Sequence, residues 1–209
     1  IIDANDKFKQ KIYIPTDSNK LYENLKKQKS FFSHSSVLFD KNLVLKLGGY
    51  RETMNKAQDY DLWLRIAEVS KIGAIKYTGV LIREHNKRIS FKDKGIEQRI
   101  YAHCANVSRI LRKDFPIIND PLDMNCKLET RKYKNFIKEY LLKTGTINFY
   151  EKLFLFKEKT NNASPRNYLL IPLFFNNFSL FIKLLLWIVK GDFISKKLAY
   201  SWVKIKRDI

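Results

Sequence analysis

The sequence is poor in the residues that build disulfide scaffolds and metal-binding modules. Its 209 residues include two cysteines, Cys104 and Cys126, seven glycines and five prolines. Two cysteines are too few for a disulfide framework, and their spacing matches no metal motif. Cys104 falls on the apolar side of a predicted helix, which indicates a buried structural thiol. The sequence also has no glycine-rich phosphate-binding loop, and its scarcity of cysteine favours a reducing, cytoplasmic compartment.

Acidic residues are scarce relative to basic ones. Forty Lys and Arg stand against 21 Asp and Glu, which gives a formal net charge of +19. Such an excess favours a polyanionic partner: nucleic acid, an anionic membrane surface or a phosphorylated substrate. The sequence lacks zinc-finger spacing, an RNP-like aromatic-basic signature and a heptad zipper. We therefore expect no nucleic-acid partner, although the charge alone permits one.

The most informative stretch is Ala-Gln-Asp-Tyr-Asp-Leu-Trp-Leu-Arg at 57–65. Apolar residues recur at helical spacing over 61–67, so Asp59 and Asp61 stand just before and at the start of a predicted helix. Acidic side chains suit that position because they can cap free amide groups. The alternative is that one carboxylate faces a cleft and accepts a proton. A glycine pair at 48–49 fits that alternative, since glycine allows close approach of a ligand, but it also fits an ordinary turn.

Four segments come in one order at characteristic gaps, and together they carry a family resemblance. They are Phe-Ser-His-Ser-Ser-Val-Leu-Phe at 32–39, Gly-Gly-Tyr-Arg-Glu at 48–52, Gln-Asp-Tyr-Asp-Leu-Trp-Leu-Arg at 58–65, and Arg-Glu-His at 83–85 followed by Ile-Ser. Over about residues 1–92 the chain resembles the acceptor-side half of family 2 glycosyltransferases. The resemblance implies an α/β fold, a partial Rossmann-like GT-A domain. Gln58 departs from the glutamate that the family typically has there.

The resemblance also implies roles for residues of the acceptor side. Asp59 would be the general base that deprotonates an acceptor hydroxyl. His34, Gly48, Gly49 and Asp61 would belong to the acceptor site. For His34 the alternative is a hydrogen-bonded core residue, and for Asp61 we favour a helix cap over a contact with a sugar hydroxyl.

On the donor side, Arg83 and His85 are implied to lie near the diphosphate, where positive charge stabilises the leaving group. The alternative is a solvated loop. His85 is also a candidate metal ligand, and the resemblance implies a divalent cation, Mn²⁺ or Mg²⁺, as cofactor. The implied partners are a nucleotide-sugar donor and a glycan or lipid-linked acceptor. The implied reaction is inverting transfer in the synthesis of bacterial surface polysaccharide, lipopolysaccharide or capsule.

The family resemblance, together with periodicity and turn residues, outlines three parts of the chain. The acceptor-side half of a GT-A domain is expected at 1–92, an α-helical region at 93–163 and a membrane-associating tail at 164–209. Short strands are predicted at 1–14, 31–39, 72–76 and 79–83. Helices are predicted at 18–29, 42–47, 61–67, 96–112, 127–142 and 147–156. The nucleotide-binding units and the metal-binding Asp-x-Asp motif would lie upstream, so we expect this chain alone to be inactive.

The tail combines an apolar run at 168–189 with a basic amphipathic helix at 194–205. The run approaches the ~20 residues of a spanning helix, but a proline, two asparagines and a lysine interrupt it. Trp202 lies on the apolar face of the helix, and anionic lipids attract the lysines around it. We expect an interfacial anchor at the inner face of the cell membrane. The alternative is that these segments are core helices.

Two other classes of function stay open. A non-catalytic membrane-associated scaffold would keep the 57–65 block only as part of its fold, and a basic nucleic-acid-binding module is allowed by charge alone. Turnover of a nucleotide sugar separates the transferase from both. A steep salt dependence of binding would mark the nucleic-acid module.

Overall fold

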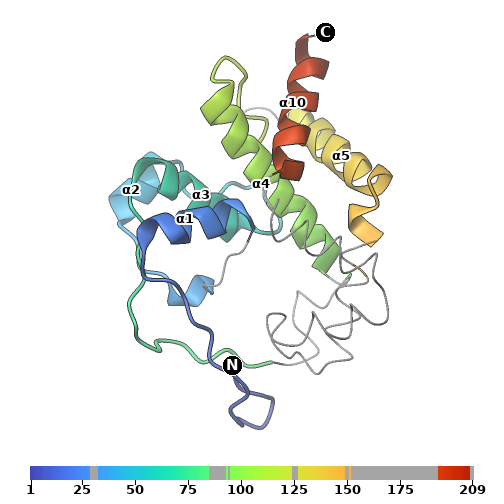
Figure 1. The fold of residues 1–209 in the computed structure, drawn as a ribbon. Coiled ribbons are helices and arrows are strands. Elements are labelled where there is room, and N and C mark those ends of the chain that lie inside the picture. The colour runs from blue at the N-terminus through green and yellow to red at the C-terminus, as the bar shows by residue number, and fades with distance from the viewer. Residues whose placement is uncertain are drawn as a thin grey trace.

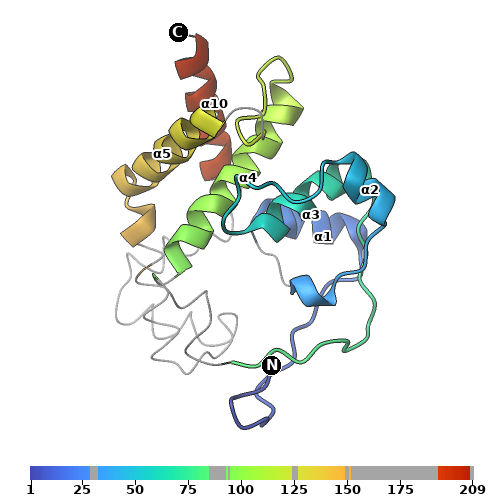
Figure 2. The same ribbon diagram turned by 180° about the vertical axis from the view of Figure 1, so that it is seen from behind.

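The computed structural model describes residues 1–28, 33–84, 93, 95–123, 127–148, 151 and 193–207. Figure 1 and Figure 2 show the helices from opposite sides. In chain order the elements are α1 (Ser18–Lys26), the 3₁₀ turn η1 (His34–Ser36), α2 (Lys41–Lys46), α3 (Gln58–Val69), α4 (Ile96–Asp114), α5 (Lys127–Lys143) and α10 (Phe193–Arg207). Helix α4 is central, because it packs against α3 on one side and against α5 and α10 on the other.

The short helices α1 and α2 begin at side-chain caps. Asp17 Oδ1 accepts a hydrogen bond from the Lys20 amide at 2.7 Å, and Asp40 Oδ1 accepts one from the Leu43 amide at 2.8 Å. Each cap satisfies one of the backbone donors that a helix leaves free at its start. Helix α1 falls inside the predicted range 18–29, and α2 begins and ends one residue before the predicted range 42–47.

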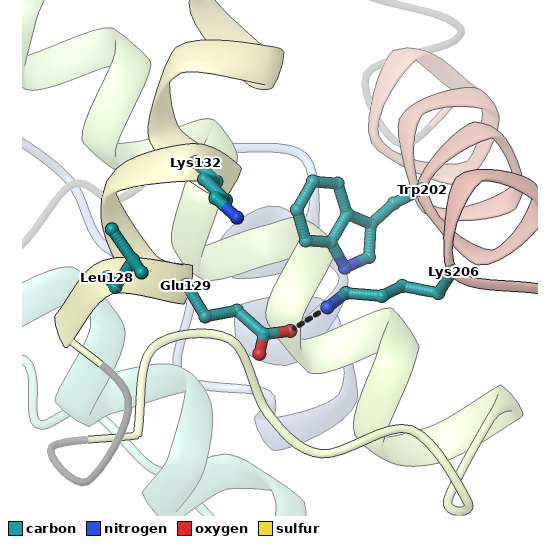
Figure 3. A pocket seen from close by; sticks show the side chains of 5 residues that line it. All are labelled: Leu128, Glu129, Lys132, Trp202 and Lys206. Atoms are coloured by element: carbon teal, nitrogen blue, oxygen red, sulfur yellow. Dashed lines mark ion pairs between the residues drawn. The ribbon is translucent and has the colours of Figure 1, made fainter. Parts of the chain in front are cut away.

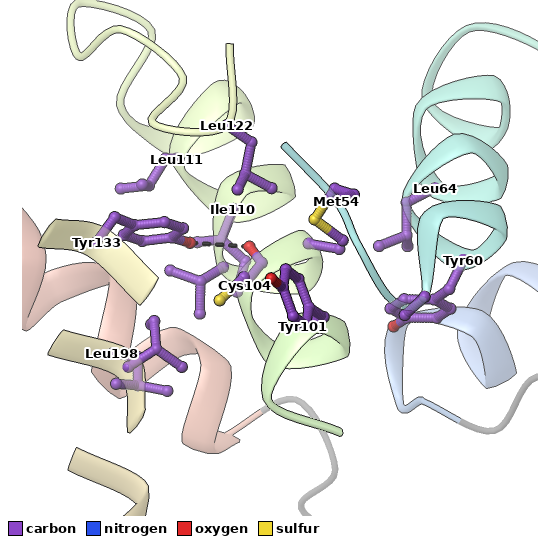
Figure 4. Close-up of a cluster of buried hydrophobic side chains, with 14 of the residues drawn as sticks. Met54, Tyr60, Leu64, Tyr101, Cys104, Ile110, Leu111, Leu122, Tyr133 and Leu198 are labelled. Atoms are coloured by element: carbon purple, nitrogen blue, oxygen red, sulfur yellow. Dashed lines mark hydrogen bonds between the residues drawn. The ribbon is translucent and has the colours of Figure 1, made fainter. Parts of the chain in front are cut away.

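The core runs along both sides of α4, whose apolar stripe contains Ile100, Cys104 and Leu111 (Figure 4). Leu64 approaches it from α3, and Leu198 from α10. Residues from all three predicted parts of the chain therefore share one hydrophobic core. Full burial of each such side chain contributes about 1.5–3 kcal/mol to the stability of the fold. Burial of this shared apolar stripe therefore stabilises the packing of α3 and α10 on α4.

Helix α10 turns its apolar face inward. The ring of Trp202 is 4% exposed and packs against Tyr133 and Phe136, with centroid distances of 5.1 and 5.3 Å. This helix is therefore a core helix, which was the alternative to the expected interfacial anchor. Its lysines lie around the buried face. None of the helices in the described residues is long and apolar enough to cross a membrane. The apolar run at 168–189 lies outside the described residues.

The prediction of an α/β, Rossmann-like GT-A domain is wrong for the residues that the structure describes. They contain helices and two isolated β-bridges, an antiparallel one between Ile2 and Phe8 and a parallel one between Ile2 and Arg83, but no strand. The segments at 72–76 and 79–83 have strand-like composition. A strand, however, is defined by backbone hydrogen bonds to a neighbouring strand. Within the described ranges, 71–84 makes such bonds only near Ile2.

The predicted strand at 31–39 is also absent from its described residues, 33–39. Its middle is the 3₁₀ turn η1, closed by a hydrogen bond from the Ser36 amide to the Ser33 carbonyl at 2.9 Å. The Ser36 hydroxyl also donates to the Ser33 carbonyl at 2.8 Å, and local side-chain hydrogen bonds of this kind compete with the pairing of a strand. Of the helices predicted downstream, 96–112 and 127–142 are confirmed by α4 and α5. Most of 147–156 lies outside the described residues.

Candidate active site

Asp59 lies in the first turn of α3. The helix begins at Gln58, three residues earlier than predicted, after Ala57 in a left-handed conformation (φ 53°). Asp59 Oδ1 accepts a hydrogen bond from the Tyr60 amide at 2.8 Å. Its other oxygen has no hydrogen-bond or ion-pair partner in the described part of the chain. The side chain is half-buried, so this carboxylate is oriented by its own helix and keeps an oxygen that can accept a proton.

Asp61 has a different environment two residues later. It is 0% exposed, and its Oδ2 lies 2.9 Å from Arg65 Nη2 and 3.0 Å from Arg65 Nε. Arg51 Nη1 approaches the other oxygen at 3.4 Å. The carboxylate thus forms a buried ion pair instead of the helix cap that we favoured. In this arrangement its oxygens are occupied by guanidinium groups.

Arg65 connects this ion pair to the glycine turn. Arg65 Nη1 donates to the Leu47 carbonyl and Nη2 to the Gly49 carbonyl, both at 2.7 Å. Burial lowers the pKa of Arg65, and the negative charge of Asp61 offsets part of that effect. Since the guanidinium ion remains charged at neutral pH in proteins, Arg65 fixes the loop after α2 against the first turns of α3.

Gly48 and Gly49 end helix α2. Both have positive φ, 79° and 66°, and their amides donate to the carbonyls of Leu45 and Val44 at 3.0 and 2.9 Å. This is the Schellman pattern of a helix C-terminus. A Cβ atom at either glycine would meet no described atom within 4 Å. The backbone conformation, and not a lack of space, therefore requires glycine here, and the turn interpretation accounts for the pair.

A second ion network ties this region to α4. Asp120 Oδ2 lies 2.6 Å from Arg51 Nη2 and 2.5 Å from Arg112 Nη1. Arg112 also binds Glu68 of α3 in bidentate fashion, at 3.0 and 2.6 Å. Burial raises the pKa of Asp120, but the charges of Arg51 and Arg112 outweigh it and hold that pKa at about 2. Asp120 is therefore ionised at neutral pH and anchors both arginines.

His34 contacts Tyr50, and the charge of Asp59 acts on Tyr50; we call these three residues the Asp59 cluster. His34 Nε2 lies 2.6 Å from the Tyr50 hydroxyl, and their rings meet edge to face at 5.6 Å. Burial raises the pKa of Tyr50, and the negative charge of nearby Asp59 raises it further. Tyr50 thus stays a neutral phenol. His34 is exposed and Asp59 half-buried, so the cluster faces solvent.

An aromatic floor supports the cluster. Trp63 of α3 is 4% exposed, and the rings of His34 and Phe39 each lie 5.9 Å from it. His34 is therefore neither a core histidine nor an isolated surface residue. It stands at the edge of an aromatic group and contacts Tyr50.

Arg83 is engaged elsewhere. Its Nη2 pairs with Asp6 Oδ1 at 2.5 Å, and its Nη1 donates to the carbonyls of Asp3 and Ala4 at 3.4 and 3.3 Å. These contacts hold the turn at residues 3–6, and none of them involves the Asp59 cluster. His85 lies outside the described residues.

The described ranges contain no group of three or more His, Cys, Asp or Glu side chains that could hold a metal ion. The Mn²⁺ or Mg²⁺ implied by the family resemblance therefore has no ligand set among them.

Sequence reasoning missed Tyr50 and the arginine network. Tyr50 had a signal, because it directly follows the glycine pair within the 48–52 motif. Arg51 and Arg65 also lie in the motifs, but the spacing of residues in the sequence could not show which carboxylates they would pair with. Asp120 carried no signal, since it lies in the segment between the helices predicted at 96–112 and 127–142.

Known proteins give one clear likeness. Over 108 residues the chain is 32% identical to the O-antigen biosynthesis glycosyltransferase WbnJ of Escherichia coli. The matched stretch covers 52% of this chain and 41% of that protein, so the chain spans about two fifths of the relative's length. No family model and no solved structure matches the chain. The likeness is to a glycosyltransferase as a class, and membership of family 2 stays a prediction.

Proposed function

We propose that the protein is a glycosyltransferase of bacterial surface polysaccharide synthesis in which Asp59 acts as the general base. One observation carries the proposal: Asp59 is oriented by the first turn of α3, and its second carboxylate oxygen has no partner among the described residues. Its charge acts on nearby Tyr50, which in turn contacts His34. The likeness to an O-antigen biosynthesis glycosyltransferase supports the reaction class.

In the proposed reaction an acceptor hydroxyl donates its proton to the free oxygen of Asp59. The hydroxyl oxygen attacks the anomeric carbon of a nucleotide sugar, the bond from that carbon to the diphosphate breaks, and a nucleoside diphosphate leaves. Attack opposite the leaving group inverts the configuration. A positioned general base of this kind contributes about 10²–10⁴-fold to the rate.

The other residues of the site position the acceptor or the base. Tyr50 and His34 offer a phenol and an imidazole next to Asp59, and both can hydrogen-bond the hydroxyls of a glycan or lipid-linked acceptor. Asp61 and Arg65 act through the turn that they hold and contact no substrate in this proposal. No step runs through a metal ion, because the residues described here supply no ligand set for one.

The donor side rests on the family resemblance. Arg83 and His85 are proposed to face the diphosphate of the nucleotide sugar. For Arg83 this requires its exposed ion pair with Asp6 to open, and an exposed pair of that kind contributes only about 0–1 kcal/mol. A cytoplasmic site at the inner face of the cell membrane would place a lipid-linked acceptor within reach.

The test uses the protein expressed from its complete gene, a panel of nucleotide sugars and a glycan or lipid-linked acceptor fraction. The expected result is acceptor-dependent release of nucleoside diphosphate from one donor, together with transfer of its sugar. Release without the acceptor would indicate hydrolysis only. No release with any donor, in the presence of acceptors from a strain that lacks the gene, would contradict the proposal and favour the scaffold.

A further inference from the structure

Helix α10 has a buried side and an exposed side, and the core accounts only for the buried one. Its five buried residues are Ser195, Leu198, Ala199, Trp202 and Val203. Lys206 also points toward α5, where its Nζ lies 2.6 Å from Glu129 Oε1 across a small pocket beside Trp202 (Figure 3). These contacts hold α10 against its neighbours and leave its opposite side turned to solvent.

The exposed side is a row of basic and aromatic residues, which we call the α10 stripe. It consists of Phe193, Lys196, Lys197, Tyr200, Lys204 and Arg207, all of them exposed. Their spacing of three and four residues places them on one side of the helix. Phe193 is 55% exposed and Tyr200 59%. The Tyr200 ring meets the Phe115 ring edge to face at 5.2 Å, so it is held in place although it is exposed.

The charge of the α10 stripe is of one sign. The 15 residues of the helix include no Asp or Glu. Lys197, Lys204 and Arg207 make no ion pair or hydrogen bond with the described residues. Asp192 and Asp208 flank the helix in the sequence, outside the described residues, so five Lys and Arg stand against two Asp over 192–208. The helix and its flanking residues therefore carry a positive excess, which an anionic partner would balance.

We propose that the α10 stripe docks the protein on a membrane surface that contains anionic lipids. The basic side chains would meet lipid phosphates. Phe193 would enter the boundary between headgroups and acyl chains, and Tyr200, an apolar ring with a polar hydroxyl, suits the same depth. This orientation is the reverse of the one expected from the sequence, which placed Trp202 in the interface.

A membrane fits this surface better than a nucleic acid does. Proteins that bind single strands place their basic and aromatic residues in a groove that follows the strand, whereas the α10 stripe runs along the outer surface of a helix. Such a surface can lie on a plane. The choice of a membrane also rests on the proposed function, in which a lipid-linked acceptor is one candidate, but the binding itself does not require catalysis.

The α10 stripe is separate from the Asp59 cluster. Helix α10 packs on α4 and α5, and α3, which carries Asp59, packs on the other side of α4. We therefore expect changes in the stripe to leave the candidate active site intact.

The experiment measures binding to vesicles and not transfer, so its failure and that of the transferase proposal are distinguishable. The 209-residue chain is sedimented with vesicles of phosphatidylcholine alone and with vesicles in which one third of the lipid is phosphatidylglycerol. We expect it to bind the mixed vesicles at least about tenfold more tightly, because the basic residues add electrostatic attraction only there.

A triple variant tests whether the α10 stripe is the surface that binds. Lys197→Gln, Lys204→Gln and Arg207→Gln together remove three of its charges and keep polar side chains at exposed positions. Each basic residue close to an anionic surface contributes about fivefold to the affinity. We therefore expect the triple variant to bind mixed vesicles about 30- to 100-fold more weakly than the wild type, with an unchanged circular dichroism spectrum.

The matched control removes the same charge from α5. Lys127→Gln, Arg131→Gln and Lys138→Gln change exposed residues that make no ion pair or hydrogen bond with the described part of the chain. Because the net charge of the two triple variants is equal, general attraction to the vesicles would fall equally in both. We expect the control to lose less than about threefold in affinity, since its residues lie outside the α10 stripe.

Four results would overturn the proposal. The first is an equal loss of affinity in the two triple variants, and the second is equal binding of the wild type to both kinds of vesicle. The third is no binding to either kind. The fourth is release of the protein from mixed vesicles by single-stranded RNA at an equal concentration of phosphate groups, which would assign the α10 stripe to nucleic acid.

Discussion

Arg65 and Asp61 lie one turn apart on α3 and form a buried ion pair, with Arg65 Nη2 2.9 Å from Asp61 Oδ2. The same guanidinium holds the carbonyls of Leu47 and Gly49. The pair therefore does more than neutralise two charges. It fixes the turn that carries Tyr50 against the helix that carries Asp59, and so it sets the geometry of the candidate site.

Breaking this pair should be costly. Arg65→Met leaves Asp61 buried without its main partner, and removal of one member of a buried pair costs about 3–5 kcal/mol. Urea unfolding followed by circular dichroism measures the change. Arg131→Met, at an exposed arginine without ion-pair or hydrogen-bond partners among the described residues, is the control and should change the free energy of unfolding by less than about 0.5 kcal/mol.

The double variant Asp61→Leu, Arg65→Met tests the origin of that loss. Since both charges are then gone, we expect it to recover part of the stability lost in Arg65→Met. This explanation would be contradicted if the double variant lost more unfolding free energy than the two single variants together.

Gly48→Ala should destabilise the protein through its backbone alone. At φ 79° an L-residue is strained, by roughly 1–2 kcal/mol. Gly73→Ala is a matched control, because Gly73 also has no described atom within 4 Å of a Cβ but lacks a positive φ. We expect Gly73→Ala to be neutral or slightly stabilising. Equal losses in the two variants, measured by thermal unfolding, would rule out backbone strain as the cause.

His103 should make the protein sensitive to mild acid. Burial, with a smaller effect from the charge of Arg99, lowers the pKa of His103 to about 3, and its Nδ1 lies 2.9 Å from Gln28 Nε2. The unfolded chain binds a proton below about pH 6.5, and the folded chain does not until about pH 3. The contribution of His103 to the unfolding free energy should therefore be fully present above pH 6.5. Below that pH the unfolding free energy should fall by up to about 1.4 kcal/mol per pH unit.

The control for His103 is His103→Gln, which removes the titrating ring and keeps a polar side chain. Its unfolding free energy should have a flatter pH dependence between pH 6 and pH 4 than that of the wild type. Parallel slopes for the two proteins would show that other groups cause the acid sensitivity.

Cys104 should be chemically inert in the folded protein. It is 0% exposed, and burial raises the pKa of its thiol to about 12. Because the thiolate is the reactive form, a thiol reagent at pH 8 should modify Cys104 only after unfolding. The measurement is reagent uptake in a Cys126→Ser background, with and without urea. Rapid modification of the native protein would contradict the burial.

The sequence predicted the helices well and the sheet wrongly. Helical periodicity is local, so the stripe of Ile100, Cys104 and Leu111 was sufficient to predict α4. A strand depends on what pairs with it, and the composition of 72–83 could not show that Ile2 is its only pairing partner among the described residues. Similarly, Trp202 on a basic amphipathic helix led us to expect a membrane interface, with a core helix as the alternative. In the structure Trp202 packs against Tyr133 and Phe136 of α5, and α10 also packs against α4.

The candidate site was predictable where chemistry and position coincide. Asp59 was picked out by its place at the start of a helix within a family motif. The different environment of Asp61 was not predictable, because two carboxylates two residues apart look alike in sequence. What distinguishes them is Arg65, which pairs with Asp61, whereas one oxygen of Asp59 has no partner in the described part of the chain.

The central claim is that Asp59 is the base, and the most direct measurement compares Asp59→Asn with wild type in kcat/KM for sugar transfer. Asp114→Asn, at an exposed aspartate with no ion pair or hydrogen bond in the described ranges, is the matched control, and circular dichroism checks that each variant is folded. We predict a loss of about 10²-fold or more for Asp59→Asn and none for Asp114→Asn. Equal turnover by wild type and a folded Asp59→Asn would contradict the claim.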